Sequence, residues 1–165
     1  MSRAKANTRL SFRRRREKKT NYKKRLALLK SNKPRLVVRK TNRQIIVQLI
    51  TFHEKGDLTH VHVSKKQLAK YGWEMKRNSP SAYLAGYLAG KIAINKGFKE
   101  AILDIGLHTP TKGCLAFIAA KGAIDAGLKI PFSAEVNDDR AKGKHLNLHE
   151  KFEEVMKKIE GEYGK

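Results

Sequence analysis

Three short runs in the first half of the chain show partial alternation of apolar and polar positions. The runs are RLVVRKT at 35–41, QIIVQLITF at 44–52 and LTHVHVS at 58–64. Alternation of this kind predicts strands in a sheet that is covered more fully on one face. Residues 41–43 are short enough for a tight hairpin, and residues 55–57 with their central glycine supply a second turn. The pattern therefore predicts a three-stranded meander.

After residue 64 the apolar positions recur at helical spacing. Ser64 and Gln67 predict a capping box for a short helix that is closed at Gly72. Ser79 and Pro80 predict the cap and first residue of a longer helix, which Gly97 would end. Small residues follow one side of this longer helix and indicate close approach to a sheet: Ala82, Gly86, Ala89, Gly90 and Ala93.

The remaining pattern continues the alternation of strands and helices. EAILDIG at 100–106 predicts a buried strand, and a helix is expected from about residue 113 to residue 126. A strand, a loop and a helix in this order imply a right-handed crossover onto the same sheet. Apolar residues at helical spacing predict a C-terminal amphipathic helix: Leu148, Phe152, Val155 and Ile159.

The predicted fold class is α/β, with a three-stranded meander followed by α-β-α on a mixed sheet. We expect a basic arm with a short helix at 1–33, an α/β core domain at 34–131, and a loop with the C-terminal helix at 132–165. Residues 1–19 have almost nothing to bury and are expected to be disordered on their own. Thr20 is predicted to cap the short helix of the arm.

Charge changes this picture most. The 165 residues carry a formal net charge of +22, and up to Arg43 there are 18 basic residues against the single acid Glu17. From Gln44 onward 19 basic residues face 14 acidic ones, so the body is nearly ordinary and the head is extreme. So much like charge indicates a polyanionic partner, because self-repulsion is relieved only when that charge is neutralised.

The basic head predicts contact with RNA or DNA phosphates, rather than a bare solvated tail. Its candidate residues are Arg9, Arg13, Arg14, Arg15, Arg16, Lys18, Lys19, Lys23 and Arg25. Five further cations in and beside the first hairpin would project from a rigid frame, although solvated edge-strand charge is an alternative; they are Lys33, Arg35, Arg39, Lys40 and Arg43. Trp73 is a candidate for stacking on a base or, equally, a core residue.

The loop DIGLHTPTKG at 104–113 lies between a predicted strand and a predicted helix, where free backbone N–H groups favour an anion. Thr111 is a candidate cap, Lys112 adds charge, and Gly113 lets a backbone come close. The order Thr-Lys-Gly is not that of a nucleotide-hydrolysing phosphate loop. Phosphate binding and an ordinary connection both remain open for this loop.

Catalysis has little support in the sequence. The topology resembles that of ribonuclease-H-type nucleases, but two-metal cleavage needs several carboxylates, and only Asp104 stands near a suitable place. Cys114 lacks a recognisable base, and His145 with His149 lacks a third metal ligand. We therefore expect no catalytic residues, no metal, no cofactor and no small-molecule substrate. A single cysteine suits a reducing compartment. The longest apolar run, 82–93, is too short to span a bilayer, which predicts a soluble cytoplasmic protein without a membrane partner.

Four separated stretches resemble a known family. They are RRRREKKTNYKKRLALLKSNKPRLVVRKTNRQIIVQLI at 13–50, AKYGW at 69–73, SPSAYLAGYLAGKIA at 79–93 and LDIGLHTPTKG at 103–113. Together they resemble large-subunit ribosomal protein eighteen of the archaeal and eukaryotic type. The resemblance runs from about residue 9 to residue 145.

This resemblance implies a structural protein that binds 5S ribosomal RNA and helps attach it to the large ribosomal subunit at the central protuberance. Its partners would be 5S rRNA, large-subunit rRNA and neighbouring ribosomal proteins. By analogy residues 13–19, Tyr22 and Arg25 would thread between RNA segments, and Arg39, Lys40, Thr41, Asn42 and Arg43 would hold 5S rRNA. His108, Thr109, Thr111, Lys112 and Gly113 would form a second RNA-facing loop. Leu115 departs from the arginine that relatives commonly carry there. A nonspecific nucleic-acid packaging protein remains an alternative.

Overall fold

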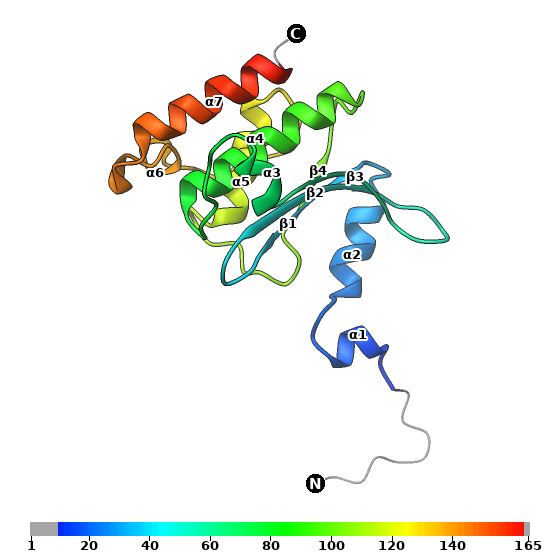
Figure 1. Cartoon of the computed structure of the whole chain (residues 1–165). Helices are drawn as coiled ribbons and strands as arrows, with labels where there is room; N and C mark the ends of the chain where they lie inside the picture. The colour runs from blue at the N-terminus through cyan, green and yellow to red at the C-terminus, as the bar shows by residue number, and fades with distance from the viewer. Residues whose placement is uncertain (1–9, 164–165) are drawn as a thin grey trace, which may run out of the picture.

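A mixed four-stranded sheet organises the computed structural model, which describes residues 10–163 (Figure 1). Strands β1 (Arg35–Lys40), β2 (Ile45–Thr51) and β3 (Leu58–Val63) form the predicted antiparallel meander, and β4 (Ile102–Asp104) pairs with β1 in parallel. The strand order is β3-β2-β1-β4. The predicted α/β class and mixed sheet are confirmed, and the ends of the three meander strands agree with the sequence pattern to within one residue.

Both predicted turns are present in the meander. In the first, the Thr41 N–H donates to the Gln44 carbonyl at 2.9 Å, which closes the β1–β2 hairpin. In the second, the Gly56 N–H donates to the His53 carbonyl at 3.0 Å. Gly56 has a φ of 150°, a conformation that residues with a Cβ rarely adopt. The two turns therefore follow from local turn chemistry, as the sequence predicts.

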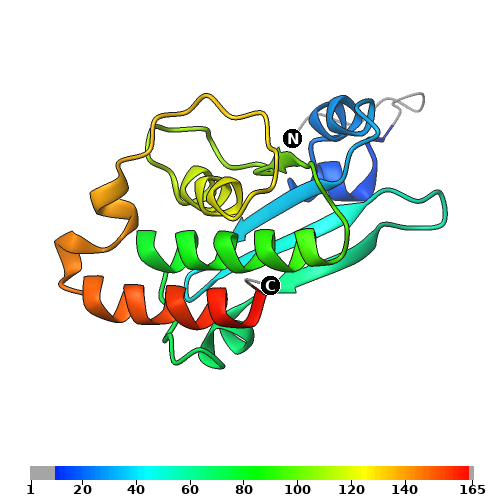
Figure 2. The same ribbon diagram turned by 90° about the horizontal axis from the view of Figure 1, so that it is seen from above.

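Helices cover one face of the sheet and the N-terminal helices lie on the other (Figures 1 and 2). The covered face carries α3 (Lys65–Ala69), α4 (Ser79–Asn95), α5 (Leu115–Asp125) and α7 (His149–Tyr163). Short helices α1 (Arg13–Arg16) and α2 (Tyr22–Leu29) lie across the opposite face. The N-terminal helices α1 and α2 thus contribute no residue to the main core.

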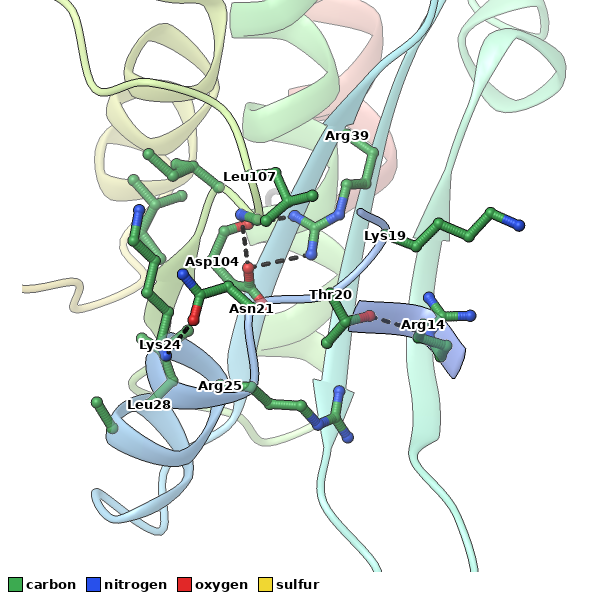
Figure 3. A pocket seen from close by; sticks show the side chains of 14 residues that line it. Arg14, Lys19, Thr20, Asn21, Lys24, Arg25, Leu28, Arg39, Asp104 and Leu107 are labelled. Carbon is green, nitrogen blue, oxygen red and sulfur yellow. Dashed lines mark hydrogen bonds and ion pairs between the residues drawn. The ribbon is translucent and has the colours of Figure 1, made fainter. Parts of the chain in front are cut away.

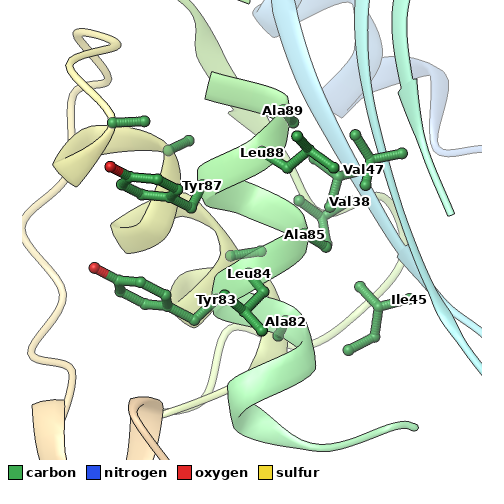
Figure 4. Close-up of a cluster of buried hydrophobic side chains, with 14 of the residues drawn as sticks. Val38, Ile45, Val47, Ala82, Tyr83, Leu84, Ala85, Tyr87, Leu88 and Ala89 are labelled. Carbon is green, nitrogen blue, oxygen red and sulfur yellow. The ribbon is translucent and has the colours of Figure 1, made fainter. Parts of the chain in front are cut away.

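The helix α4 is almost wholly buried because it packs against both the sheet and α5. Toward the sheet, Ala85 and Leu88 face Val38 and Val47 (Figure 4). The glycines of α4 face α5 instead: a Cβ on Gly86 would lie 1.8 Å from the Ala119 carbonyl oxygen. The expectation that these small residues admit a sheet is therefore wrong for Gly86 and Gly90. They admit a second helix, because only a glycine surface lets two helix backbones come this close.

Helix starts differ from prediction by one to three residues. Asn21, not Thr20, caps α2 by accepting from the Lys24 N–H at 3.1 Å. Asn78, not Ser79, caps α4 by accepting from the Ser81 N–H at 3.1 Å. Helix α5 begins after Cys114, so Thr111 does not cap it. The hydroxyl of Thr20 is engaged elsewhere, since it accepts from Arg14 Nε at 2.9 Å.

The capping box before α3 is present, with the Ser64 N–H donating to Gln67 Oε1 at 3.0 Å. At the C-terminus, α7 buries Phe152, Val155 and Ile159 against the core, as its spacing predicts. The sequence pattern did not predict α6 (Asp138–Ala141) or the 3₁₀ turn η1 (Lys144–Leu146), which lead into α7. Among the described residues, no helix is both long enough and apolar enough to cross a membrane.

The single helical turn α1 lies within the arm that is expected to be disordered on its own, of which residues 1–9 lie outside the described residues. Arg13 Nε donates to Glu17 Oε1 at 2.7 Å, one turn away, and Lys19 Nζ reaches the other Glu17 oxygen at 2.8 Å. None of the α1 side chains is buried. The turn is therefore held by local ion pairs of the kind that stabilise exposed helices.

Candidate nucleic-acid interface

The N-terminal segment, residues 10–33, presents most of its cations to solvent. Arg15, Arg16, Lys18 and Lys23 are exposed, and within residues 10–163 no carboxylate pairs with them. Tyr22 is half-buried, with its ring 5.3 Å from that of Phe12. Arg9 lies outside the described residues. The segment thus carries positive charge that the fold itself does not neutralise.

A chain of ion pairs ties this segment to the sheet. Arg25 donates to both oxygens of Asp57 at 2.8 Å, and Arg35 Nη2 donates to Asp57 Oδ2 at 2.7 Å. The other end of Arg35 donates to Asp104 Oδ2 at 2.9 Å. Asp57 belongs to the β2–β3 turn and Asp104 ends β4, so Arg35 joins two separate loops. Arg25 pairs with Asp57 as well, which ties α2 to the β2–β3 turn.

Arg35 is the clearest departure from the predicted site. Its side chain is only 3% exposed, and its two terminal nitrogens are engaged by carboxylates. A buried and paired guanidinium cannot reach a phosphate. Arg35 therefore stabilises the interface by pairing with Asp57 and Asp104 beneath it, without contacting the partner itself. The sequence pattern concealed this role because its acidic partners are 22 and 69 positions away along the chain.

Burial and charge act in opposite directions on Asp57. Partial burial tends to raise its pKa, but the hydrogen bond from Arg25 and the charges of Arg25 and Arg35 outweigh this effect and hold the pKa below its ordinary value. Asp57 is therefore ionised at neutral pH. Arg25 and Arg35 neutralise its negative charge, so Asp57 does not repel an approaching polyanion.

Three hydrogen bonds hold Arg39 at the edge of the predicted interface. Its Nη1 donates to the carbonyl oxygens of Val38 and Asp104 at 2.9 and 2.8 Å, and its Nη2 donates to Asp104 Oδ1 at 3.0 Å. The side chain remains 39% exposed. Gly106, with a φ of 65°, makes room for it, because a Cβ there would lie 2.9 Å from Arg39 Cζ. The guanidinium is fixed in position while one part of it faces solvent.

The β1–β2 turn and the loop after β4 lie side by side, which sequence spacing did not predict. Lys40, His108 and Thr109 line one small hollow together with Cys114. Burial, followed by the charges of Lys40 and Arg39, lowers the pKa of His108 below its ordinary value. His108 is thus neutral at pH 7 and lies within the field of two cations.

Exposed residues extend this surface on both sides. From the turn these are Lys40, Thr41, Asn42 and Arg43, and from the loop they are Thr109, Thr111, Lys112 and Gly113. Lys112 Nζ comes no nearer than 3.9 Å to Glu135, and both side chains are about nine-tenths exposed, so this pair is weak. The structure therefore brings the two predicted RNA-facing segments into one basic edge.

Two other predicted residues lie away from this edge or are already engaged. Trp73 is 3% exposed, and its indole N–H donates to Ser81 Oγ at 2.9 Å within the core. It cannot stack on a base, so the core interpretation of Trp73 is the one the structure supports. Lys33 pairs with Glu100 at 2.7 Å, with 40% of its side chain exposed.

The structure adds a feature that the sequence did not reveal. A cleft of about 500 Å³, here called the α2 cleft, opens between the N-terminal segment and residues 103–107 (Figure 3). Asn21, Lys24 and Leu28 line it from α2 and its cap, and Leu107 lines it from the loop. The sequence hinted at it only through two apolar residues, Ile105 and Leu107, in a largely polar loop.

The geometry of Asp104 does not favour the nuclease alternative. Both of its oxygens are engaged, with Arg35, with Arg39 and with the Gly106 N–H, which donates at 2.8 Å. Over residues 10–163 no three His, Cys, Asp or Glu side chains group as metal ligands. Asp104 therefore organises two arginines and caps a loop.

Comparison with known proteins identifies the family. The model described as "Ribosomal large subunit proteins 60S L5, and 50S L18" matches residues 6–100 and 95–133. "Large ribosomal subunit protein uL18" of Korarchaeum cryptofilum is 52% identical over 149 residues, covering 88% of this chain and 76% of that protein. The protein of the same name from Methanospirillum hungatei is 50% identical, covering 83% and 80%, and that from Haloquadratum walsbyi is 54% identical, covering 82% and 67%. The chain therefore belongs to the family of large ribosomal subunit proteins 60S L5 and 50S L18, and is a structural constituent of the large subunit of the cytoplasmic ribosome, not an enzyme.

Proposed function

We propose that this chain binds 5S rRNA and helps attach it to the large-subunit rRNA in the central protuberance. The observation that carries the proposal is the set of exposed cations on the N-terminal segment and the β1–β2 turn that have no carboxylate partner among residues 10–163. Neutralising phosphates with such cations releases condensed counterions and drives binding. Membership of a large-subunit ribosomal family makes ribosomal RNA the polyanion in question.

The two groups of cations have different roles in this proposal. The N-terminal segment is tied to the body through Arg25 and Lys33 and presents its other cations on and beside two short helices, so it mainly supplies affinity. The β1–β2 turn is hydrogen-bonded into the sheet and holds its side chains on a rigid frame, which fixes orientation. The proposed contacts are Arg9, Arg13, Arg14, Arg15, Arg16, Lys18, Lys19, Tyr22, Lys23, Arg25, Lys33, Arg39, Lys40, Thr41, Asn42, Arg43, His108, Thr109, Thr111, Lys112 and Gly113.

These proposed contacts assign a different role to each part of the chain. Residues 1–33 act as the RNA-binding arm, residues 34–131 as the core that holds the turn and loop, and residues 132–165 as a segment that faces other components. The outer side of α7 is exposed and carries acids such as Glu150, Glu153 and Glu154. Such a surface suits a neighbouring ribosomal protein with a basic patch better than RNA.

The test is a filter-binding titration of 5S rRNA over a range of salt concentrations. Replacing residues 13–16 by Ala removes four cations, and if each meets one phosphate the slope of log K against log salt becomes shallower by about 3. The matched control also removes four exposed cations, but outside the proposed interface: Lys129, Lys151, Lys157 and Lys158 replaced by Ala. The control should leave the slope within about 1 of the original.

Two outcomes would overturn the proposal. If both quadruple variants change the slope equally, net charge alone explains the binding. If the original chain binds 5S rRNA and a random RNA duplex of equal length with the same affinity, the packaging alternative replaces specific 5S recognition.

A further inference from the structure

The α2 cleft has an apolar floor that the fold leaves open to solvent. Leu28, Leu103, Ile105 and Leu107 line it, and Leu107 is 50% exposed despite its size. The volume of about 500 Å³ lies within the range of sites that hold a small organic group. A large apolar side chain kept at the mouth of a cleft indicates that something apolar packs against it.

The rim of the cleft is cationic. Five basic side chains line it, and the single acid among the lining residues is Asp104; the five are Arg14, Lys19, Lys24, Arg25 and Arg39. Both Asp104 oxygens accept hydrogen bonds, from Arg35, Arg39 and the Gly106 N–H, so the two arginines neutralise its charge. The cleft therefore favours a ligand that carries negative charge at the rim and an apolar face below it.

A nucleotide has this combination of groups. Its base can lie against aliphatic side chains and the plane of an arginine, and its phosphate can meet the rim through charge-assisted hydrogen bonds. The Asn21 side chain accepts from the Lys24 N–H through its oxygen, and in the described part of the chain its amide nitrogen donates to no acceptor, which leaves a donor for a base edge. A phosphate in a stacked duplex would meet the rim but leave the leucine floor unused.

We propose that the α2 cleft receives one unstacked nucleotide of the bound ribosomal RNA, with its base on the leucine floor and its phosphate at the rim. This inference rests on the RNA binding proposed above. It assigns a base contact, distinct from phosphate contacts, to the junction between the N-terminal segment and the loop after β4. The base on the leucine floor then contributes affinity that does not depend on salt.

The experiment fills the cleft without removing charge. Ala27 is exposed on α2 and lines the cleft, so Ala27→Trp places an indole where the base would lie. Ala69→Trp is the matched control, at an exposed position on α3, which belongs to the opposite side of the sheet. Loss of one stacked base should weaken 5S rRNA binding about 5- to 100-fold for Ala27→Trp. The salt slope should become shallower by no more than about 1, because displacing the nucleotide removes at most its one phosphate contact at the rim.

A crosslinking readout locates the nucleotide directly. 5S rRNA containing 4-thiouridine should crosslink to peptides from residues 21–28 and 103–107 of the original chain, and these crosslinks should disappear with Ala27→Trp. If Ala27→Trp fails to fold by circular dichroism, Leu107→Ser tests the same floor without added volume, with weaker binding and an unchanged salt slope expected.

Failure of this inference is distinguishable from failure of the proposed function. If the cleft variants bind 5S rRNA within twofold of the original chain, the cleft holds no nucleotide while RNA binding stands. A salt slope shallower by more than about 1 would show the loss of phosphate contacts beyond that of one nucleotide and would also overturn the inference. If the original chain ignores 5S rRNA at low salt, the proposed function itself fails.

Discussion

Replacing Asp104 by Asn tests whether the buried carboxylate holds the interface together. In the structure this side chain accepts from Arg35 at 2.9 Å, from Arg39 at 3.0 Å and from the Gly106 N–H at 2.8 Å. Asn keeps the shape but presents an NH₂ group toward a guanidinium donor. At least one charged hydrogen bond is therefore lost, and Arg35 remains buried with only Asp57 as its counter-ion.

The magnitude follows from the burial of the pair. Arg35 and Asp104 are 3% and 8% exposed, so water replaces little of the lost interaction. Removing one partner of a buried ion pair costs about 3–5 kcal/mol of the free energy of unfolding. For a chain of this length that corresponds to a melting temperature lower by roughly 6–20 °C. Arg39 would also lose its fixed position beside the loop after β4.

Urea unfolding followed by Trp73 fluorescence measures this loss, because Trp73 is buried in the core and becomes exposed on unfolding. Glu100→Gln is the matched control: Glu100 pairs with Lys33 in an ion pair whose side chains are 50% and 40% exposed, so the cost should be about 0–1 kcal/mol. If Asp104→Asn costs no more than this control, the buried network does not stabilise the fold and the reasoning about Arg35 is refuted.

Three further predictions concern packing and protonation. Gly86→Ala should lower the free energy of unfolding by about 3 kcal/mol or more, because its Cβ would lie 1.8 Å from the Ala119 carbonyl oxygen. Gly161→Ala is the control: no atom lies near its Cβ, so it should raise the free energy of unfolding by about 0.5–1 kcal/mol. Thermal melts that rank the two variants the other way would contradict the α4–α5 contact. The pKa of Asp57 is depressed in the folded chain, so the stability that its carboxylate contributes is present above the unfolded pKa of about 4 and is lost as the pH falls through the folded pKa. Urea titrations should show the original chain losing more stability in acid than Asp57→Asn. Equal losses would disprove the role of this carboxylate. The pKa of His108 is lowered in the free chain, and a nearby phosphate would raise it. Affinity for 5S rRNA should therefore increase as the pH falls from about 7.5 to about 5.5, and His108→Gln should abolish this pH dependence. A pH profile of affinity that is identical for both chains would place His108 outside the interface.

Much of the fold could be predicted because its signals are local. The ends of β1, β2 and β3 follow from alternation and turn residues, and the spacing of Phe152, Val155 and Ile159 marks the buried side of α7. Small errors arose where two adjacent residues offered similar chemistry. Asn78 caps α4 in place of Ser79 because the extended backbone and the amide oxygen that the first turn requires are those of Asn78.

The candidate site was predicted in outline for a similar reason. A head with 18 basic residues and one acid indicates a polyanion whatever the fold, because net charge needs no geometry. Which cations are free to bind was not predictable. Arg35 and Arg43 read alike in the sequence, yet Arg35 is buried between two carboxylates and Arg43 is exposed on the turn.

By itself the sequence determined the strands, the helices α2, α3, α4, α5 and α7, the family resemblance and the sign of the partner's charge. Each of these depends on residue types that are near one another in the chain. Only the tertiary structure decided that Asp104 meets Arg35, 69 positions away, that Gly86 faces a helix, and that an apolar cleft opens beneath the N-terminal segment. These features arise from contacts between distant segments, and a pattern along the chain does not show which distant segments will meet.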